Sequence, residues 1–438
     1  MSWFNEVTFY HIYPLGAFDA PKRNEGDETA GSRILQLLDW IPHLESLGIG
    51  ALFIGPIFES AAHGYDTIDY FTPDRRLGTK EEFQKVFGEL HTRGIRIVLD
   101  GVFGHVGRRC PLYQDVLANG DSSPYRWWFR NLNFGPGNPT GDPVTYENWG
   151  GDWNLVRLNL ANPDVRNYIL SAVGSWMDDY GIDGLRLDTA DVLDPALFRD
   201  LNRYCKGRVP DFWLMGEFMN CANCQAMQPD QLDSITNYEC WKGMYSSCNS
   251  HNLYEISYGI NRQTNPEWGM YKGKYLYNFL DNHDQTRIAS MLTDRRHLKA
   301  LYTMLLTMPG IPSVYYGSEW GMEGTKGYGG EADYPLRMPM TKEAMESGDA
   351  DLMKHISELA QFRKTSPALQ YGSYTNVKEG NEQLLYAREC DGEALLVAFN
   401  ISDRPASIQA DFKGTAVDIP LEAFESRIIP CESAADRG

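Results

Sequence analysis

Three carboxylates of this chain, Asp188, Glu217 and Asp284, stand at or just beyond the ends of short apolar runs that have the composition of buried strands. Arg186 lies two residues before Asp188, and because side chains alternate between the faces of a strand, both point the same way. In a barrel of parallel strands the carboxyl ends of all strands meet at one mouth. We therefore expect these three carboxylates in one site, with Arg186 beside them.

Crowded carboxylates repel one another, so stability alone would not favour this arrangement. Cleavage of a glycosidic bond gives it a purpose, because a retaining mechanism needs a carboxylate nucleophile and a carboxylic acid about 5–5.5 Å apart. Burial and neighbouring negative charge raise the pKa of the acid, whereas Arg186, beside Asp188, keeps that carboxylate ionised. His283 follows the same run as Asp284, and His105 follows another run, at residues 95–100. Both histidines can donate hydrogen bonds to sugar hydroxyls.

Each of these residues alone also has a structural explanation, since strand-end carboxylates cap helices and buried Asp–Arg pairs stabilise cores. Asp100 is interpreted in that way, as a residue that orders the loop behind the site. The chain has no His-x-x-x-His or His-Glu-x-x-His spacing, which argues against a zinc hydrolase.

The elements that must position these residues alternate along most of the chain. Apolar runs predict eight strands, at residues 7–13, 49–54, 95–100, 182–188, 212–217, 233–237, 275–281 and 311–316. Amphipathic patterns predict helices between them, at residues 34–47, 80–92, 164–180, 195–205, 295–307 and 350–364. Eight strands alternating with helices predict an α/β fold, a (β/α)8 TIM barrel. The first strand is not followed by Gly-x-Gly-x-x-Gly, which argues against dinucleotide binding.

Two segments interrupt this alternation. Residues 106–156 are rich in Gly, Pro, Asn and Trp, and we predict that they form a small inserted domain B after strand 3 of a barrel built from residues 1–105 and 157–370. Residues 371–438 show short alternating runs, at residues 383–390, 393–401 and 407–412, and predict a C-terminal antiparallel β domain, a β-sandwich. Four tryptophans of the insertion have two explanations, stacking on sugar rings or packing within the segment: Trp127, Trp128, Trp149 and Trp153.

Composition narrows the classes of partner. The 438 residues carry a formal net charge of −19, which disfavours nucleic acid and anionic membranes as partners. An uninterrupted apolar run of about 18 residues, as a membrane span requires, is absent from the sequence. The N-terminus does not resemble a secretory signal, so we expect a cytoplasmic protein.

Eight cysteines are scattered along the chain, and reduced thiols are expected for a protein without an export signal. Cys221-x-x-Cys224, with Cys240 and Cys248 following, leaves a zinc site as an alternative. The spacing of the last pair is loose for such a site, and ordinary thiols are favoured.

Taken together, the motifs resemble glycoside hydrolase family 13, the α-amylase family, over essentially the whole chain. The resemblance rests on these stretches: Asp100–His105, Gly184–Asp188, Gly216-Glu217, Asn282-His283-Asp284, Gly64-Tyr65-Asp66 and Gly310–Glu319. It implies that Asp188 is the nucleophile, Glu217 the general acid/base and Asp284 the stabiliser of the transition state. It also implies that Tyr65, His105, Arg186 and His283 line the sugar subsite at the cleavage point. Asp333 and Arg337 resemble the pair that grips the next sugar on the non-reducing side.

Within the family, Tyr146–Gly151 and His63–Asp66 resemble the cyclomaltodextrinase, neopullulanase and maltogenic amylase group. That group carries an N-terminal β domain that supports dimerisation, whereas the barrel pattern here begins within the first residues. Gly104 stands where many amylases place a calcium-binding asparagine. We therefore expect no metal or other cofactor, with a calcium site elsewhere left as the alternative.

The sequence therefore predicts a retaining α-glucan hydrolase that cleaves α-1,4-glucosidic bonds of maltooligosaccharides, dextrins or starch. Two alternatives use the same site: an α-glucanotransferase, in which a sugar hydroxyl intercepts the covalent intermediate, and an α-glucosidase. A catalytically inactive relative that acts as a binding protein is disfavoured by the intact Asp188, Glu217 and Asp284. The predicted partner is an oligosaccharide or α-glucan; the oligomeric state is left open.

Overall fold

The computed structural model describes residues 2–26, 31–220 and 225–431. Across them, eight strands form one parallel sheet in the order β13-β12-β11-β5-β2-β1-β15-β14. Their bounds are β1 Thr8–Ile12, β2 Ile49–Ile54, β5 Arg96–Gly101, β11 Gly184–Leu187, β12 Trp213–Gly216, β13 Ser234–Ile235, β14 Tyr277–Phe279 and β15 Ile311–Tyr315. Thr236, directly after β13, bridges to Tyr277 of β14 and so joins the two ends of this order. The predicted barrel is confirmed.

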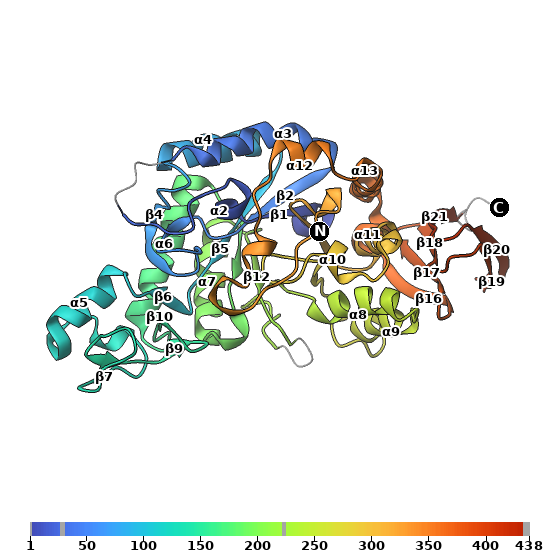
Figure 1. The fold of residues 1–438 in the computed structure, drawn as a ribbon. Coiled ribbons are helices and arrows are strands. Elements are labelled where there is room, and N and C mark those ends of the chain that lie inside the picture. The colour runs from blue at the N-terminus through green and yellow to red at the C-terminus, as the bar shows by residue number, and fades with distance from the viewer. Residues whose placement is uncertain (1, 27–30, 221–224, 432–438) are drawn as a thin grey trace. The chain divides into compact units, whose positions relative to one another are not determined.

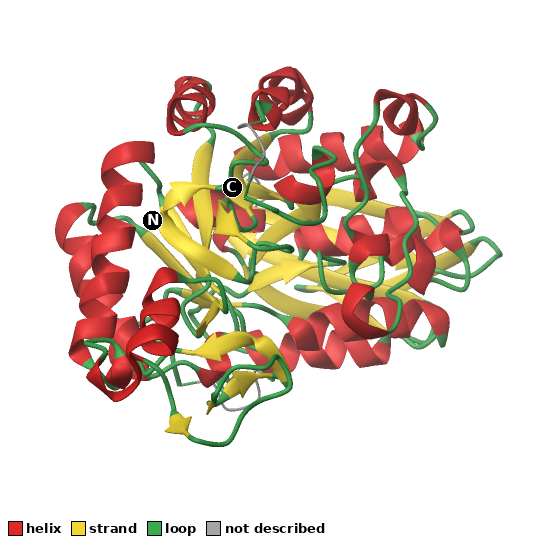
Figure 2. Cartoon of the chain, turned by 60° about the vertical axis from the view of Figure 1, so that its left-hand side comes forward, coloured by secondary structure: helices red, strands yellow, loops and turns green. Residues whose placement is uncertain are grey.

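Helices follow the strands of this sheet, red beside yellow in Figure 2. The longer ones are α3 Gln36–Ser46, α4 Lys80–Thr92, α6 Pro163–Tyr180, α7 Pro195–Arg208, α8 Tyr238–Asn249, α9 Tyr254–Thr264, α11 Leu298–Thr307 and α13 Ala350–Thr365. The shorter ones are α1 Trp3–Glu6, α2 Pro14–Ala17, α5 Pro111–Asn119, α10 Ile288–Met291, α12 Lys342–Glu346 and α14 Pro367–Tyr371. None of the helices in the described ranges is long and apolar enough to cross a membrane.

Local signals explain the helix boundaries that the sequence predicts well. α4 begins at a capping box, in which the Thr79 side chain accepts from the Glu82 N–H and the Glu82 side chain accepts from the Thr79 N–H. These bonds satisfy two backbone donors that the first turn leaves open. α6 starts with an Asn162 cap and Pro163, and ends at Gly181, whose φ of 64° lies in the left-handed region that glycine tolerates.

The chain divides into two compact units, each described by itself below. The insert-bearing unit comprises Ile12–Ile41 and Leu52–Ile235, and the C-terminal unit comprises Met1–His11, Pro42–Ala51 and Thr236–Gly438. The catalytic barrel thus contributes strands to both units.

The insert-bearing unit holds β5, β11 and β12 as neighbours (Figure 1). Its smaller strands are β3 Phe58–Ser60 paired with β4 Thr67–Pro73, the three-stranded sheet of β6 His105–Gly107, β10 Asp152–Arg157 and β9 Asn148–Trp149, and the pair of β7 Asn133–Phe134 with β8 Val144–Thr145. β6 leaves the end of β5 and pairs with β10, so the inserted segment starts and ends on adjacent strands.

The C-terminal unit ends in antiparallel strands, brown to red in Figure 1. One sheet contains β16 Ser373–Glu379, β17 Gln383–Cys390, β18 Glu393–Asn400 and β21 Ser426–Cys431, and a hairpin contains β19 Ala406–Phe412 and β20 Thr415–Leu421. Leu385 and Leu396 of the sheet share one apolar cluster with Ile408 and Ile419 of the hairpin. The predicted antiparallel β domain is confirmed, with β16, β20 and β21 added to the three strands that the sequence indicates.

Candidate active site

The register of three strands aligns the polar residues of the insert-bearing unit. Arg186 of β11 is paired with Asp100 of β5 on one side and with Met215 of β12 on the other. The pairing extends past the strand ends, because the Asp188 N–H donates to the Gly101 carbonyl (3.1 Å) and the Glu217 N–H donates to the Leu187 carbonyl (2.9 Å). Asp188 and Glu217 therefore occupy equivalent positions at neighbouring carboxyl ends.

One guanidinium group connects all the carboxylates of this cluster. Nη1 of Arg186 donates to both oxygens of Asp100 (2.7 and 2.9 Å) and to Oδ1 of Asp188 (2.9 Å). Nη2 of Arg186 lies 2.7 Å from Oε2 of Glu217. Burial by itself lowers the pKa of Arg186, but the carboxylates of Asp100 and Glu217 outweigh it, and the net shift is upward. Arg186 stays a cation, and three acids share its single charge.

Asp100 belongs to this cluster more closely than the sequence indicates. Besides Arg186, its carboxylate accepts a hydrogen bond from the Tyr65 hydroxyl (2.9 Å). Complete burial, only partly offset by Arg186, raises the pKa of Asp100 from 3.8 to about 7. Asp100 therefore retains a proton at mildly acidic pH and anchors Tyr65, which stands in the turn between β3 and β4.

Thr189 follows Asp188 with a φ of 44°, in the left-handed region that a β-branched residue rarely adopts. From this position its N–H donates to Oε2 of Glu217 (3.1 Å) and its hydroxyl donates to Oδ2 of Asp188 (3.3 Å). The unusual backbone thus allows one residue to hold both carboxylates.

His105 begins the inserted segment and is buried. Its Nε2 lies 2.9 Å from the Tyr65 carbonyl oxygen, which indicates an Nε2–H tautomer when neutral. Burial lowers the pKa of His105 to about 4, so the ring is uncharged at neutral pH. Trp149 stacks on this ring at 5.9 Å between centroids, and Arg157 lies over the indole at 5.3 Å. Of the four tryptophans noted in the sequence, Trp149 therefore contacts the predicted site residues.

The C-terminal unit brings together the other predicted residues. Asp284 follows β14, and its backbone N–H donates to the side chain of Asn282 (2.9 Å), which turns the chain. Nη2 of Arg337 donates to Oδ1 of Asp284 (2.8 Å) and to Oδ2 of Asp333 (3.1 Å). Nε of Arg337 also donates to the His283 carbonyl (3.0 Å), while Nε2 of His283 lies 2.9 Å from Oδ2 of Asp284. Both carboxylate oxygens of Asp284 are therefore in contact with a neighbouring side chain, Oδ1 with Arg337 and Oδ2 with His283.

No group of three or more His, Cys, Asp or Glu side chains suited to a metal ion occurs within the described ranges. At Gly104, an added Cβ would lie 3.2 Å from Cδ2 of Leu193, so a longer side chain such as asparagine would press on that leucine. Cys221 and Cys224 lie outside the described residues, and Cys240 and Cys248 are buried free thiols.

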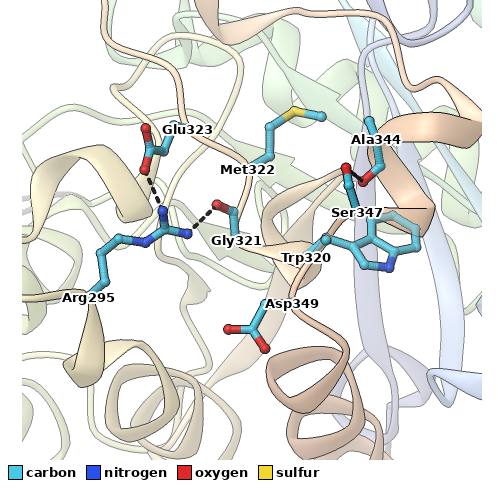
Figure 3. Close-up of a pocket in the computed structure, with 9 residues that line it drawn as sticks. Arg295, Trp320, Gly321, Met322, Glu323, Ala344, Ser347 and Asp349 are labelled. Carbon is cyan, nitrogen blue, oxygen red and sulfur yellow. Dashed lines mark hydrogen bonds and ion pairs between the residues drawn. The ribbon is translucent and has the colours of Figure 1, made fainter.

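A separate cavity of about 480 Å³ lies in the C-terminal unit, between Arg295, Met322 and Trp320 (Figure 3). Trp320 is only 8% exposed, because His43 stacks on it at 4.4 Å and the Gly348 backbone lies against it. The indole has no free face for a sugar ring, and none of the predicted site residues lines this cavity.

A model of the alpha-amylase catalytic domain matches residues 12–359. The chain therefore belongs to the α-amylase family, and it is a glycoside hydrolase. Among curated proteins, a cyclomaltodextrinase of a Bacillus species is 29% identical over 419 residues, which cover 91% of this chain and 73% of the relative. An intracellular maltogenic amylase of Bacillus subtilis is 28% identical over 422 residues, 91% of this chain and 69% of the relative.

Among solved structures, the maltose complex of a cyclic α-maltosyl-(1→6)-maltose hydrolase from Arthrobacter globiformis matches with a TM-score of 0.86 and 27% identity. The match covers 98% of this chain and all of that chain. The predicted resemblance to the cyclomaltodextrinase and maltogenic amylase group is thus confirmed in both sequence and fold.

Proposed function

We propose that this protein is a retaining α-glucan hydrolase that cleaves α-1,4-glucosidic bonds through a covalent glucosyl-enzyme. In this mechanism the Asp188 carboxylate attacks the anomeric carbon while Glu217 protonates the departing glycosidic oxygen. Glu217, now a carboxylate, then removes a proton from water, whose oxygen attacks the anomeric carbon and releases Asp188. Asp284 stabilises the positive charge that develops on the sugar ring.

The single observation that carries this proposal is the bridging of Asp188 and Glu217 by Arg186. A guanidinium group that contacts two carboxylates keeps them near one another, and of the two mechanisms the retaining one has the shorter separation between its carboxyl groups. An inverting site would leave room for a water molecule between them. The left-handed Thr189 fixes the same two groups, which favours a preorganised pair.

Substrate contacts are proposed for the residues around these groups. Tyr65 is held by Asp100 so that its ring can stack on the sugar at the cleavage point. The uncharged ring of His105 and the ring of His283 can donate hydrogen bonds to hydroxyls of that sugar, and Arg186 stabilises the charge of the nucleophile.

Asp333 and Arg337 are proposed to bind the next sugar on the non-reducing side. No metal ion or other cofactor enters the proposed reaction.

The relatives support the class of substrate. Their names refer to cyclic maltodextrins, to maltose and to cyclic maltosyl-maltose. All three are sugars built from α-linked glucose. We propose maltooligosaccharides, short dextrins or starch for this chain, and a cytoplasmic location by analogy with the intracellular relative.

The anomeric form of the first product tests the mechanism. We expect proton NMR during maltotriose hydrolysis to show the α-anomer before mutarotation, because two displacements retain configuration. Products longer than maltotriose at high substrate concentration would instead identify a transglycosylase, and glucose as the sole first product from long dextrins would identify an α-glucosidase. The β-anomer as first product would contradict the retaining mechanism.

A further inference from the structure

Lys326 makes contacts that the sequence motifs do not indicate. Its Nζ donates to the backbone carbonyl of Asp284 (2.9 Å) and lies 2.9 Å from Oδ1 of Asp333. Its own backbone N–H donates to the Thr286 hydroxyl (3.0 Å). Lys326 therefore connects the segment after β14 with the loop that carries Asp333.

Asp333 is consequently held between two cations, with Lys326 on Oδ1 and Arg337 on Oδ2. Both cations also contact Asp284: Lys326 donates to the backbone carbonyl of Asp284, and Arg337 donates to the Asp284 carboxylate. A carboxylate held by one cation can rotate about its side-chain bonds, whereas two cations on opposite oxygens fix its plane. The direction in which Asp333 can accept a hydrogen bond from a sugar hydroxyl is thereby fixed relative to Asp284.

The loop beyond Lys326 is closed on itself. The Gly327 N–H donates to the Ala332 carbonyl (2.7 Å), and the Ala332 N–H donates to the Gly329 carbonyl (3.1 Å). The closed turn brings Asp333 back beside Lys326, seven positions along the chain, so the ion pair does not depend on the loop tip.

We propose that Lys326 is a positioning residue for the donor side of the site: it orients Asp333 toward the second sugar and keeps that contact in register with Asp284. The inference rests on the proposed function, in which Asp333 grips the sugar beyond the cleaved residue. The Lys326 side chain is 43% exposed, and exposed ion pairs contribute little to stability. Its removal should therefore affect substrate binding more than folding.

Glycosyl fluorides of two lengths test this role, because fluoride occupies the leaving-group position and all sugars lie on the donor side. We expect Lys326→Met to lower kcat/KM for α-maltotriosyl fluoride about tenfold or more, mainly through KM, and for α-glucosyl fluoride less than about threefold. Lys326→Arg should restore most of the loss, since it keeps a cation that can reach both partners. Melting temperatures should stay close to that of the wild type.

Lys342→Met is the matched control, because Lys342 is 88% exposed and its contact to Glu346 is a loose 3.6 Å. This variant also removes one positive charge from the C-terminal unit, and its kcat/KM for both fluorides should equal that of the wild type. If the wild type is active, an equal loss of kcat/KM on both fluorides in Lys326→Met, or no loss on either, would overturn the inference. A wild-type protein inactive on both fluorides would overturn the proposed function itself, and this inference with it.

Discussion

At the scale of the residue, charge balance around Arg186 decides the chemistry. Asp100, Asp188 and Glu217 surround one guanidinium, so full ionisation would leave excess negative charge in a buried place. The raised pKa of Asp100, about 7, relieves this excess by keeping a proton on the one acid of the three that the proposed reaction does not use. In the proposed reaction Asp188 begins as a carboxylate and Glu217 begins as the protonated acid.

The sequence predicts the pairing of Arg186 with Asp188, because alternation along one strand places both on one face. It does not reveal Asp100 as their partner, since that depends on the register between β5 and β11, which are more than eighty residues apart in the chain. The sequence likewise does not reveal the partners of Lys326, because its contact with Asp333 depends on the fold of the loop between them. Contacts within one element can be predicted, and contacts set by tertiary register cannot.

Buried His105 makes stability sensitive to acid. Its folded-state pKa of about 4 lies below the usual histidine pKa of 6.5, so as pH falls between these values the unfolded chain binds a proton that the folded chain does not. Stability present above pH 6.5 is therefore lost toward pH 4, by up to about 3 kcal/mol. Between pH 7 and pH 4, the free energy of unfolding measured in urea should fall by about 3 kcal/mol less in His105→Gln than in the wild type.

Gln keeps an N–H that can donate to the Tyr65 carbonyl, and His251→Gln, at an exposed position, serves as control. The control should follow the wild type at both pH values. Parallel losses in wild type, control and His105→Gln would mean that His105 is not the group responsible.

At the scale of the element, boundaries with local signals are the ones that the sequence predicts. The expected helix at residues 80–92 agrees with α4 at both ends, because a capping box opens it and Gly94 follows it. α8 and α9 were not predicted, since Gly, Ser, Cys and Asn interrupt their apolar pattern. Tertiary packing overrides weak helix propensity there, with an Asn237 cap that accepts from the Cys240 N–H.

β6 depends on a glycine for its approach to the segment that carries Tyr65. A Cβ at Gly107 would lie 2.4 Å from the Asp66 carbonyl oxygen, a backbone atom that cannot move aside locally. We expect Gly107→Ala to lower the free energy of unfolding by about 1–3 kcal/mol and to lower activity, because Asp66 adjoins Tyr65. Denaturant unfolding and kcat/KM on maltotriose measure the two effects.

Gly88→Ala in α4 is the matched control, since no atom lies within 4 Å of its added Cβ. There alanine should stabilise the helix by about 0.5–1 kcal/mol and leave activity unchanged. If both substitutions had the same small effect, the close approach of β6 would not constrain the site.

At the scale of the whole molecule, the barrel distributes the proposed machinery over two compact units. The insert-bearing unit supplies Asp188 and Glu217, and the C-terminal unit supplies Asp284. The sequence predicts this barrel because its strands and helices alternate in order, and the strand order of the structure agrees. The antiparallel strands at the C-terminus were predicted only in part, since β20 and β21 have few fully buried side chains to mark them.

The central claim is a covalent glucosyl-enzyme formed on Asp188 with Glu217 as acid/base, and Glu217→Gln tests it most directly. α-Glucosyl fluoride needs little protonation to leave, so this variant should still form the intermediate but should not activate water to release it. Intact-mass analysis should then show protein carrying one glucosyl group, and peptide mapping should place that group on Asp188. Azide, which needs no base, should release it as a glycosyl azide, whereas maltotriose should remain uncleaved. An unlabelled protein that is equally slow on fluoride and maltotriose and indifferent to azide, or a label on another residue, would contradict the account.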